Sequence, residues 1–138
     1  AGAGSYEPID RDVTAVEPSA TMRAQRPPHL TTAIDATAEN LPFPEKSFDA
    51  ALASVTIHQW SDLRRGLSEL QRVTRGPIVL LVADPERLHD FWLNHYAPEV
   101  LAQESRRFPP VATVTALLGG DVRVQAVPIP FDCKDGFN

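Results

Sequence analysis

Apolar positions at helical spacing single out residues 61–75 as the clearest helix of the chain. The repeat is formed by Leu63, Leu67, Leu70 and Val73, and it places one apolar stripe on one face of a helix. Ser61 is a candidate N-cap, since a serine oxygen can accept a bond from an unpaired amide of the first turn. Gly76 suits the position after the last helical residue, and Pro77 prevents the helix from continuing.

Runs of apolar and β-branched residues predict strands on both sides of this helix. Residues 78–82 are apolar throughout, as in a strand whose sheet is covered on both faces. Residues 48–55 predict a second buried strand. Shorter strands are predicted at residues 12–17, 30–36 and 122–127.

Proline punctuates the remaining segments and predicts short helices. One covers about residues 19–26, another begins at Asp84 with Pro85 in its first turn, a third follows Pro98, and a fourth ends at Gly119. Strands and helices therefore alternate along the chain, which predicts an α/β fold with a mostly parallel sheet. We expect a single domain over residues 1–138.

Composition narrows the classes of partner. The net charge is −5 and no basic patch is concentrated anywhere, which argues against nucleic-acid binding. The longest apolar run, residues 77–83, is too short to span a bilayer. The single cysteine, Cys133, cannot form an internal disulfide and fits a cytoplasmic location. No group of residues has metal-ligand spacing, so we expect no metal site.

A glycine-rich turn and one acidic residue are the first candidates for a ligand site. Gly2 and Gly4 allow the backbone to approach a ligand where a Cβ would collide. Glu17 ends the strand predicted next, where a carboxylate can accept hydrogen bonds from the ribose hydroxyls of an adenosine ligand. Each feature alone also fits a flexible terminus or a surface carboxylate, but together they favour a nucleoside site.

Three segments carry a resemblance to one family. Residues 1–6 resemble the end of the motif Asp-x-Gly-x-Gly-x-Gly, with Gly2 and Gly4 as its last two glycines. Residues 13–22 resemble the family's second motif, and residues 37–49 resemble a bacterial signature written A-E-x-L-P-F followed by S-F-D. The chain is thus similar to class I S-adenosyl-L-methionine-dependent methyltransferases, within the bacterial group that has this signature.

The resemblance implies a fold and a cofactor. The fold is a Rossmann-like three-layer sandwich whose first strand, which would precede the glycines, is missing, so that the domain is incomplete at both ends. The cofactor is S-adenosyl-L-methionine, with Glu17 on the ribose and residues 37–38 at the adenine. The implied cofactor-binding residues are Gly2, Gly4, Glu17, Pro18, Ser19, Met22, Thr37, Ala38, Glu39 and Ser54. Many relatives have aspartate where this chain has Thr37.

His58 is the candidate catalytic residue. In the family, the segment after the strand that ends near Ser54 lies beside the methionine part of the cofactor. The sulfonium is already an activated donor, so that most catalysis comes from positioning, and a base is needed only for a protonated acceptor. Packing beside Trp60 is the alternative role for His58. The acceptor is expected to be a small molecule.

Two other functions stay open at this stage. A nicotinamide-binding Rossmann oxidoreductase would need G-x-G-x-x-G/A, but Glu7 stands at the sixth position from Gly2. A non-catalytic methyltransferase-like fragment or interaction module is the second. The missing strand would lie between the strands that end at Glu17 and near Ala53, so we expect these to pair directly, to borrow a strand in a homodimer, or to belong to a longer protein.

The missing strand leads to two further expectations, one about the glycine turn and one about cofactor binding. In the first two of those arrangements the turn has no anchor, so Gly2 and Gly4 should be mobile. The chain alone should then bind S-adenosylmethionine poorly.

Overall fold

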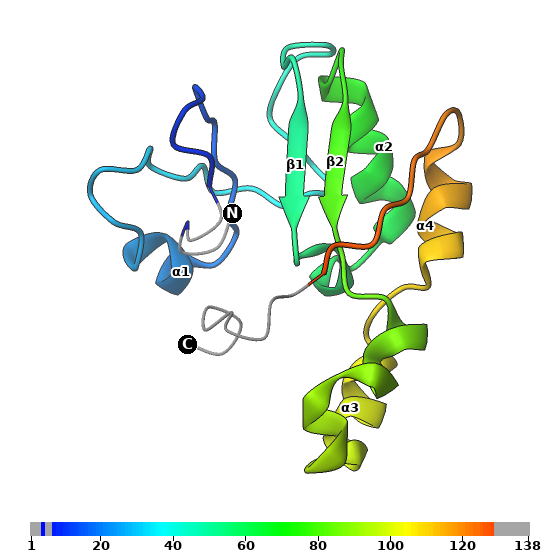
Figure 1. Cartoon of the computed structure of the whole chain (residues 1–138). Coiled ribbons are helices and arrows are strands. Elements are labelled where there is room, and N and C mark those ends of the chain that lie inside the picture. Colours follow the sequence, from blue (N-terminus) through cyan, green and yellow to red (C-terminus); the bar gives the residue numbers. More distant parts are fainter. Residues whose placement is uncertain (1–3, 5–6, 129–138) are drawn as a thin grey trace.

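A computed structural model describes residue 4 and residues 7–128 of the chain as a mixed α/β fold (Figure 1). Two strands and four α-helices are connected by short 3-10 helices. The elements are α1 (Ala20–Ala24), β1 (Ala51–Ser54), η1 (Ile57–Gln59), α2 (Leu63–Val73), β2 (Ile78–Leu81), η2 (Pro85–Asp90), η3 (Trp92–His95), α3 (Pro98–Ser105) and α4 (Val111–Leu118).

The sheet is parallel, as the alternation of elements predicts. Strand β1 pairs with β2 in the register that sets Ala53 opposite Leu80. Backbone hydrogen bonds continue past the strand ends, from Ala51 N to Pro77 O at 3.1 Å and from Val55 N to Leu81 O at 2.8 Å. Because the strands are parallel, both carboxyl ends lie at the same edge of the sheet, which we call the carboxyl edge.

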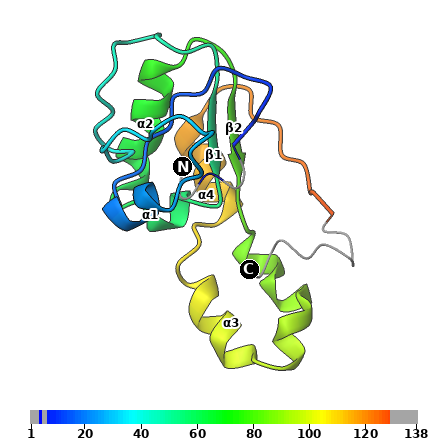
Figure 2. The same ribbon diagram turned by 90° about the vertical axis from the view of Figure 1, so that its left-hand side faces the viewer.

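One face of the sheet carries the core. Ala53 packs in a cluster with Ile57, Leu67 and Val114, where Leu67 of α2 is only 1% exposed. Helices α2 and α4 cover this face (Figure 2). Since side chains alternate along a strand, the neighbouring positions point the other way, and there Leu52, Val79 and Leu81 are 47%, 54% and 38% exposed.

The loop of residues 37–47 is held against α2 by an ion pair. Glu69 and Arg72 bond to each other at 2.7 Å, and both reach the loop backbone. Arg72 donates to the carbonyl oxygens of Leu41 and Phe43 at 3.0 and 2.7 Å, while Glu69 accepts from Leu41 N at 3.0 Å. The hydrogen bond from Arg72, against a smaller opposing effect of burial, lowers the pKa of Glu69.

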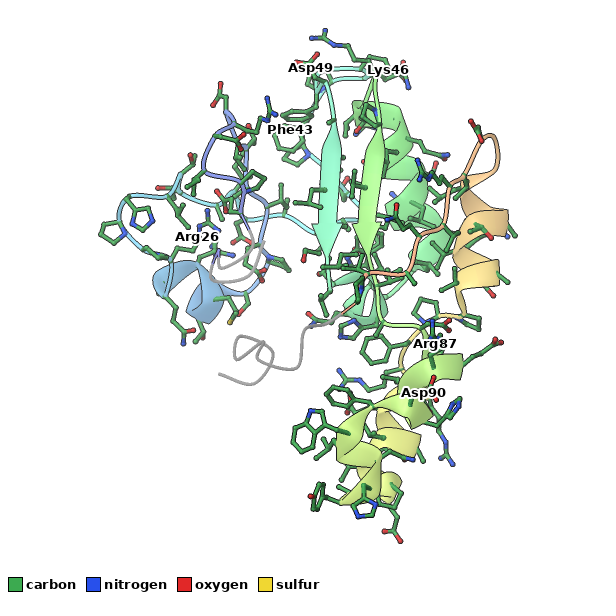
Figure 3. The ribbon with its side chains drawn as sticks, in the orientation of Figure 1. Arg26, Phe43, Lys46, Asp49, Arg87 and Asp90 are labelled. Atoms are coloured by element: carbon green, nitrogen blue, oxygen red, sulfur yellow. The ribbon has the colours of Figure 1, made fainter. Side chains whose placement is uncertain are left out.

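Both ends of α2 are capped. At its start the N-cap is Asp62, whose side chain accepts from Arg65 N at 3.0 Å, one residue later than the serine expected from the sequence. At its end Lys46 donates through Nζ to Gln71 O and Thr74 O at 2.9 and 2.8 Å, where a cation suits the helix dipole. Lys46 and Asp49 lie together at the amino end of β1 (Figure 3).

The two strands expected at residues 12–17 and 30–36 are shorter than the sequence predicts. They form one parallel bridge, Val16 with Ile34, supported by Glu17 N to Ile34 O at 3.0 Å and Ile34 N to Ala15 O at 2.8 Å. Direct pairing of this bridge with β1 is not found within the described residues, where the sheet consists of β1 and β2. Among the described residues, the two segments share this one bridge and no longer ladder.

Two other expectations need correction. Residues 122–128 form no strand, although valines recur there, and Val124 and Val127 are 62% and 66% exposed. The segment crosses over β2 without joining the sheet (Figure 1), so its backbone has no ladder partner that would make it a strand. The helix expected after Asp84 is divided into η2 and η3. Among the described residues, no helix is both long and apolar enough to cross a membrane.

The contacts of Arg72 with the 37–47 loop and with Glu69 can be tested by a conservative substitution. Arg72→Lys should lower the free energy of unfolding by about 1–3 kcal/mol, because an ammonium cannot serve two carbonyl oxygens and a carboxylate in the fork geometry of a guanidinium. Urea denaturation measures this change. Arg64→Lys, on the exposed side of the same helix, is the matched control. An equal effect of the two substitutions would contradict a stabilising role for the bonds between Arg72 and the loop.

Candidate functional site

The candidate site lies at the carboxyl edge of the parallel strands. Ligands of open α/β sheets bind outside these ends. A helical lobe, residues 84–108, lies below this edge in the view of Figure 3. It contains η2, η3 and α3 and includes Arg87 and Asp90. Two segments that the sequence singles out meet at the carboxyl edge, because Glu39 of the 37–47 loop bonds to Ser61 after β1. A third, the turn after Val16, follows the carboxyl end of the separate bridge between Val16 and Ile34.

Glu17 is held in a defined turn at the start of α1. Its Oε1 accepts a hydrogen bond from Ser19 N at 2.9 Å, and its carbonyl oxygen accepts from Arg23 at 2.7 Å. Ser19 is the N-cap of α1, accepting from Met22 N at 3.3 Å. Pro18 and Met22 are exposed. The carboxylate is therefore oriented by the backbone that follows it, as a ribose-binding acid would need.

Gly4 is buried beside Leu30, and the mobility expected of the glycine turn stays a prediction. Its φ of 96° lies in the left-handed region, and a Cβ there would collide with Leu30 Cδ1. Beside it, Glu7 and Arg26 form an ion pair at 2.6 Å with side chains 8% and 4% exposed. Packing on Leu30 thus explains this glycine within the described residues, and Gly2 lies outside them.

Glu39 has a structural partner at the start of α2. Its Oε1 accepts from Ser61 N at 2.7 Å, from Ser61 Oγ at 2.9 Å and from Asp62 N at 3.3 Å. Burial opposes ionisation of Glu39, but these bonds and a backbone amide bond of Glu39 itself outweigh it and lower its pKa. With Oε1 committed to α2, the neighbouring Thr37, which is exposed, and Ala38 are better placed to meet a ligand.

The end of β1 combines an unpartnered hydroxyl with a strained turn. Ser54 Oγ is buried and has no hydrogen-bond partner among the described residues, although buried polar groups are nearly always paired. The next residue, Val55, has a φ of 46°, which a β-branched residue rarely adopts and which is typical of functional sites. This turn leads into η1, where Ile57 is 3% exposed and anchors the segment in the core.

His58 stands in η1 beside the helical lobe. Its ring lies 4.3 Å from that of Phe108, centroid to centroid, with the planes tilted by 38°. Burial, then the positive charge of Arg107, lowers the pKa of His58, while Glu104 opposes the shift. The lowered pKa favours the neutral form of the imidazole. Trp60, the alternative neighbour expected from the sequence, packs against the core instead.

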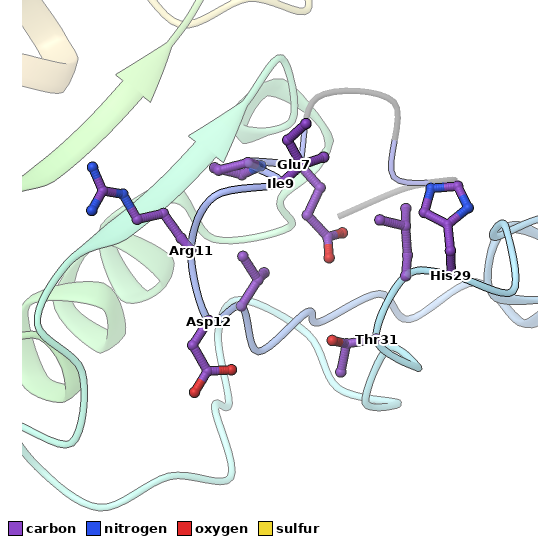
Figure 4. Close-up of a pocket in the computed structure, with 9 residues that line it drawn as sticks. Glu7, Ile9, Arg11, Asp12, His29 and Thr31 are labelled. Carbon is purple, nitrogen blue, oxygen red and sulfur yellow. The ribbon is translucent and has the colours of Figure 1, made fainter.

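Two hollows in the structure lie apart from these residues. The larger, of about 200 Å³, is lined by nine residues at the amino ends of the paired Val16 and Ile34 segments, among them Arg11, Asp12 and His29 (Figure 4). A second, of about 150 Å³, lies inside the helical lobe. Neither is lined by a residue implied to bind the cofactor. In the described part of the chain, no three His, Cys, Asp or Glu residues are arranged to hold a metal ion.

Sequence reasoning did not identify several residues that shape the site. The contacts of Glu39 and Lys46 with α2, and the ring of Phe108 beside His58, join segments far apart in the sequence, and no local pattern marks them. Proline supplies one usable signal, because Phe108 directly precedes Pro109 and Pro110 and a residue before proline is restricted to extended conformations.

Comparison with known proteins places this geometry in a family. A family model described as a methyltransferase domain matches residues 2–81. A solved structure from Anabaena variabilis, assigned as a methyltransferase of an antibiotic biosynthesis pathway, superposes with a TM-score of 0.68 at 37% identity, over 76% of this chain and 43% of that one. A S-adenosylmethionine-dependent methyltransferase from Thermotoga maritima, for which histamine N-methylation has been suggested, gives 0.59 at 27% identity, over 75% and 51%.

A curated relative extends the comparison. The rice (Oryza sativa subsp. japonica) chloroplastic 2-methyl-6-phytyl-1,4-hydroquinone methyltransferase 2 is 36% identical over 66 residues, which are 47% of this chain and 18% of that protein. The chain spans about a fifth of the length of the curated relatives it matches, 21% and 18%. The likeness therefore covers the Rossmann-like part that carries the carboxyl edge, in agreement with the fold expected from the sequence.

The role of Glu39 yields a prediction. Glu39→Gln should lower the free energy of unfolding at neutral pH by about 1 kcal/mol, the scale of an N-terminal helix cap. The folded-state pKa of Glu39 is lowered, so its contribution is present above the unfolded-state pKa and is lost as pH falls through the folded-state value.

Urea denaturation of the parent chain, Glu39→Gln and the control Glu45→Gln across the acid range measures this pH dependence of stability. The stability of Glu39→Gln should depend less on pH than that of the parent chain, while Glu45→Gln, at an exposed position of the same loop, should change little. A loss of cofactor affinity without a loss of stability would instead mean that Glu39 binds the ligand.

Proposed function

Because the chain belongs to the family of methyltransferase domains, we propose that it transfers a methyl group from S-adenosyl-L-methionine to a small-molecule acceptor. The observation that carries the proposal is that two polar groups follow the carboxyl ends of parallel segments. Glu17 has its carboxylate fixed by Ser19 N, and Ser54 has a buried hydroxyl without a partner among the described residues. Both stand at carboxyl ends of parallel segments.

The residues at this edge fit the cofactor. Of the two buried hydroxyls that lack a described partner, Thr74 Oγ1 lies at the amino end of the sheet and Ser54 Oγ at the carboxyl end. A ligand at the carboxyl edge offers Ser54 the polar partner it lacks. Glu17 would hold the ribose, and the exposed Met22 offers an apolar side chain for the adenine. The full proposed set is Gly2, Gly4, Glu17, Pro18, Ser19, Met22, Thr37, Ala38 and Ser54, with Glu39 through its backbone.

His58 is the proposed proton acceptor. When bound, S-adenosylmethionine supplies a methyl group on a positively charged sulfur, ready for transfer. The chain must then orient the acceptor, exclude water and remove a proton where the acceptor carries one. A neutral imidazole can take that proton, and the lowered pKa of His58 favours its neutral form.

The acceptor class follows from relatives with diverse small substrates. The proteins compared above are named for a hydroquinone and, as a suggestion, for histamine, and both are small molecules. The family match does not favour a nicotinamide-dependent oxidoreductase or a non-catalytic module. A homodimer through the free edge of β1, a cytoplasmic location and poor cofactor binding by this chain alone stay predictions from the sequence.

The ribose contact is tested in the intact protein that carries this chain. Glu17→Ala should weaken binding of S-adenosylhomocysteine by about 1.5–3 kcal/mol, the scale of hydrogen bonds to a charged group. Calorimetric titration measures this, with NAD as the contrasting ligand. Asp12→Ala, which removes an exposed carboxylate of the same segment, should leave affinity unchanged. Unchanged affinity in Glu17→Ala would contradict the assignment of Glu17 to the ribose. Tighter binding of NAD than of S-adenosylhomocysteine would contradict the proposed methyltransferase function.

His58 is tested by turnover. His58→Gln should lower kcat by about a hundredfold, the lower range for a general base, while the dissociation constant for S-adenosylhomocysteine stays nearly the same. His95→Gln, in the exposed part of the helical lobe, is the matched control. If His58→Gln unfolds the domain, the histidine has a packing role instead.

A further inference from the structure

We propose that Phe108 is a positioning residue that sets the orientation of the His58 imidazole and ties it to the helical lobe. The proposal rests on the proposed function, in which His58 receives a proton from the acceptor. The two residues come from segments 50 positions apart in the sequence and meet at the carboxyl edge of the sheet.

The contact joins two separately anchored segments. His58 belongs to η1, which Ile57 fixes in the core at 3% exposure. Phe108 follows α3, and its backbone N donates to Ser105 O at 3.3 Å. Ring centroids 4.3 Å apart, with planes tilted by 38°, form a close face contact that restricts rotation of the imidazole.

The chain around Phe108 is stiff. Pro109 and Pro110 come next, and a proline restricts the residue before it to extended backbone conformations. Pro110 is also the N-cap of α4, whose Val114 is 4% exposed in the same core as Ile57. The backbone that carries Phe108 is therefore followed directly by a helix anchored in the core.

The charged neighbours of His58 come from the same turn as Phe108. Arg107 and Glu104 pair with each other at 3.2 Å, and both act on the imidazole, the arginine to lower and the glutamate to raise its pKa. The larger cause is burial, to which the contacting ring contributes. A movement of the lobe that withdrew Phe108 would therefore change both the direction of the imidazole and its proton affinity.

The experiment follows the His58 imidazole directly in the intact protein. Its pKa is measured by NMR titration in Phe108→Ala, Phe108→Leu and the control Phe91→Leu, which alters a phenylalanine of the lobe that contacts Trp92. Phe108→Ala should raise the pKa of His58 towards its ordinary value, because burial is lost. The acid limb of kcat/KM should shift upwards by the same amount, and the control should show neither change.

Phe108→Leu separates orientation from burial. Leucine keeps most of the apolar cover but lacks the flat ring, so kcat should fall about tenfold to a hundredfold, as for a misplaced catalytic group, with the KM for the cofactor unchanged. An unchanged pKa of His58 in Phe108→Ala, or full kcat in Phe108→Leu, would overturn the proposal. Full turnover in His58→Gln would also overturn it, and retained S-adenosylhomocysteine binding would then show that the proposed function survives.

Discussion

The arrangement depends on two sets of hydrogen bonds: Arg72 donates to the backbone of the 37–47 loop, and Glu69 accepts from it. This loop has no strand partner of its own, and its prolines keep it out of regular structure. The pair fixes Leu41 and Phe43 to α2. On one side of them the chain leads back to Thr37 at the candidate site, and on the other it enters β1. Near its two ends the same loop is also held by Glu39, which accepts from Ser61, and by Lys46, which donates to Gln71 and Thr74.

The elements predicted well are those with a strong local pattern. Helix α2 has four apolar residues on one stripe, and β2 is an apolar run between a glycine turn and a capped helix start. In both, the local sequence determines the type of secondary structure, and contacts with distant segments add little. The 12–17 and 30–36 segments have similar composition, but they form a single bridge, Val16 with Ile34. Whether such a segment becomes a strand depends on what lies at its edges, which the segment itself does not encode.

For the same reason, the sequence predicts some features of the candidate site and not others. The positions of Glu17 and Ser54 follow from where strands end, and the described geometry is consistent with them. The capping role of Glu39 and the packing of Gly4 on Leu30 depend on side chains from other segments. The Phe108 contact of His58 spans α2, β2 and the helical lobe. Contacts over such separations follow from the assembled fold and are not visible in a local pattern.

The exposed apolar face of the sheet affects the temperature dependence of stability. Leu52, Val79 and Leu81 stay in contact with water in the folded chain, so unfolding exposes less new apolar surface than in a sheet covered on both faces. The heat-capacity change of unfolding scales with that surface. For the part of the chain that the structure describes, we therefore expect a flatter stability curve than for an α/β domain covered on both faces, and a segment or partner that covered the face would increase its curvature.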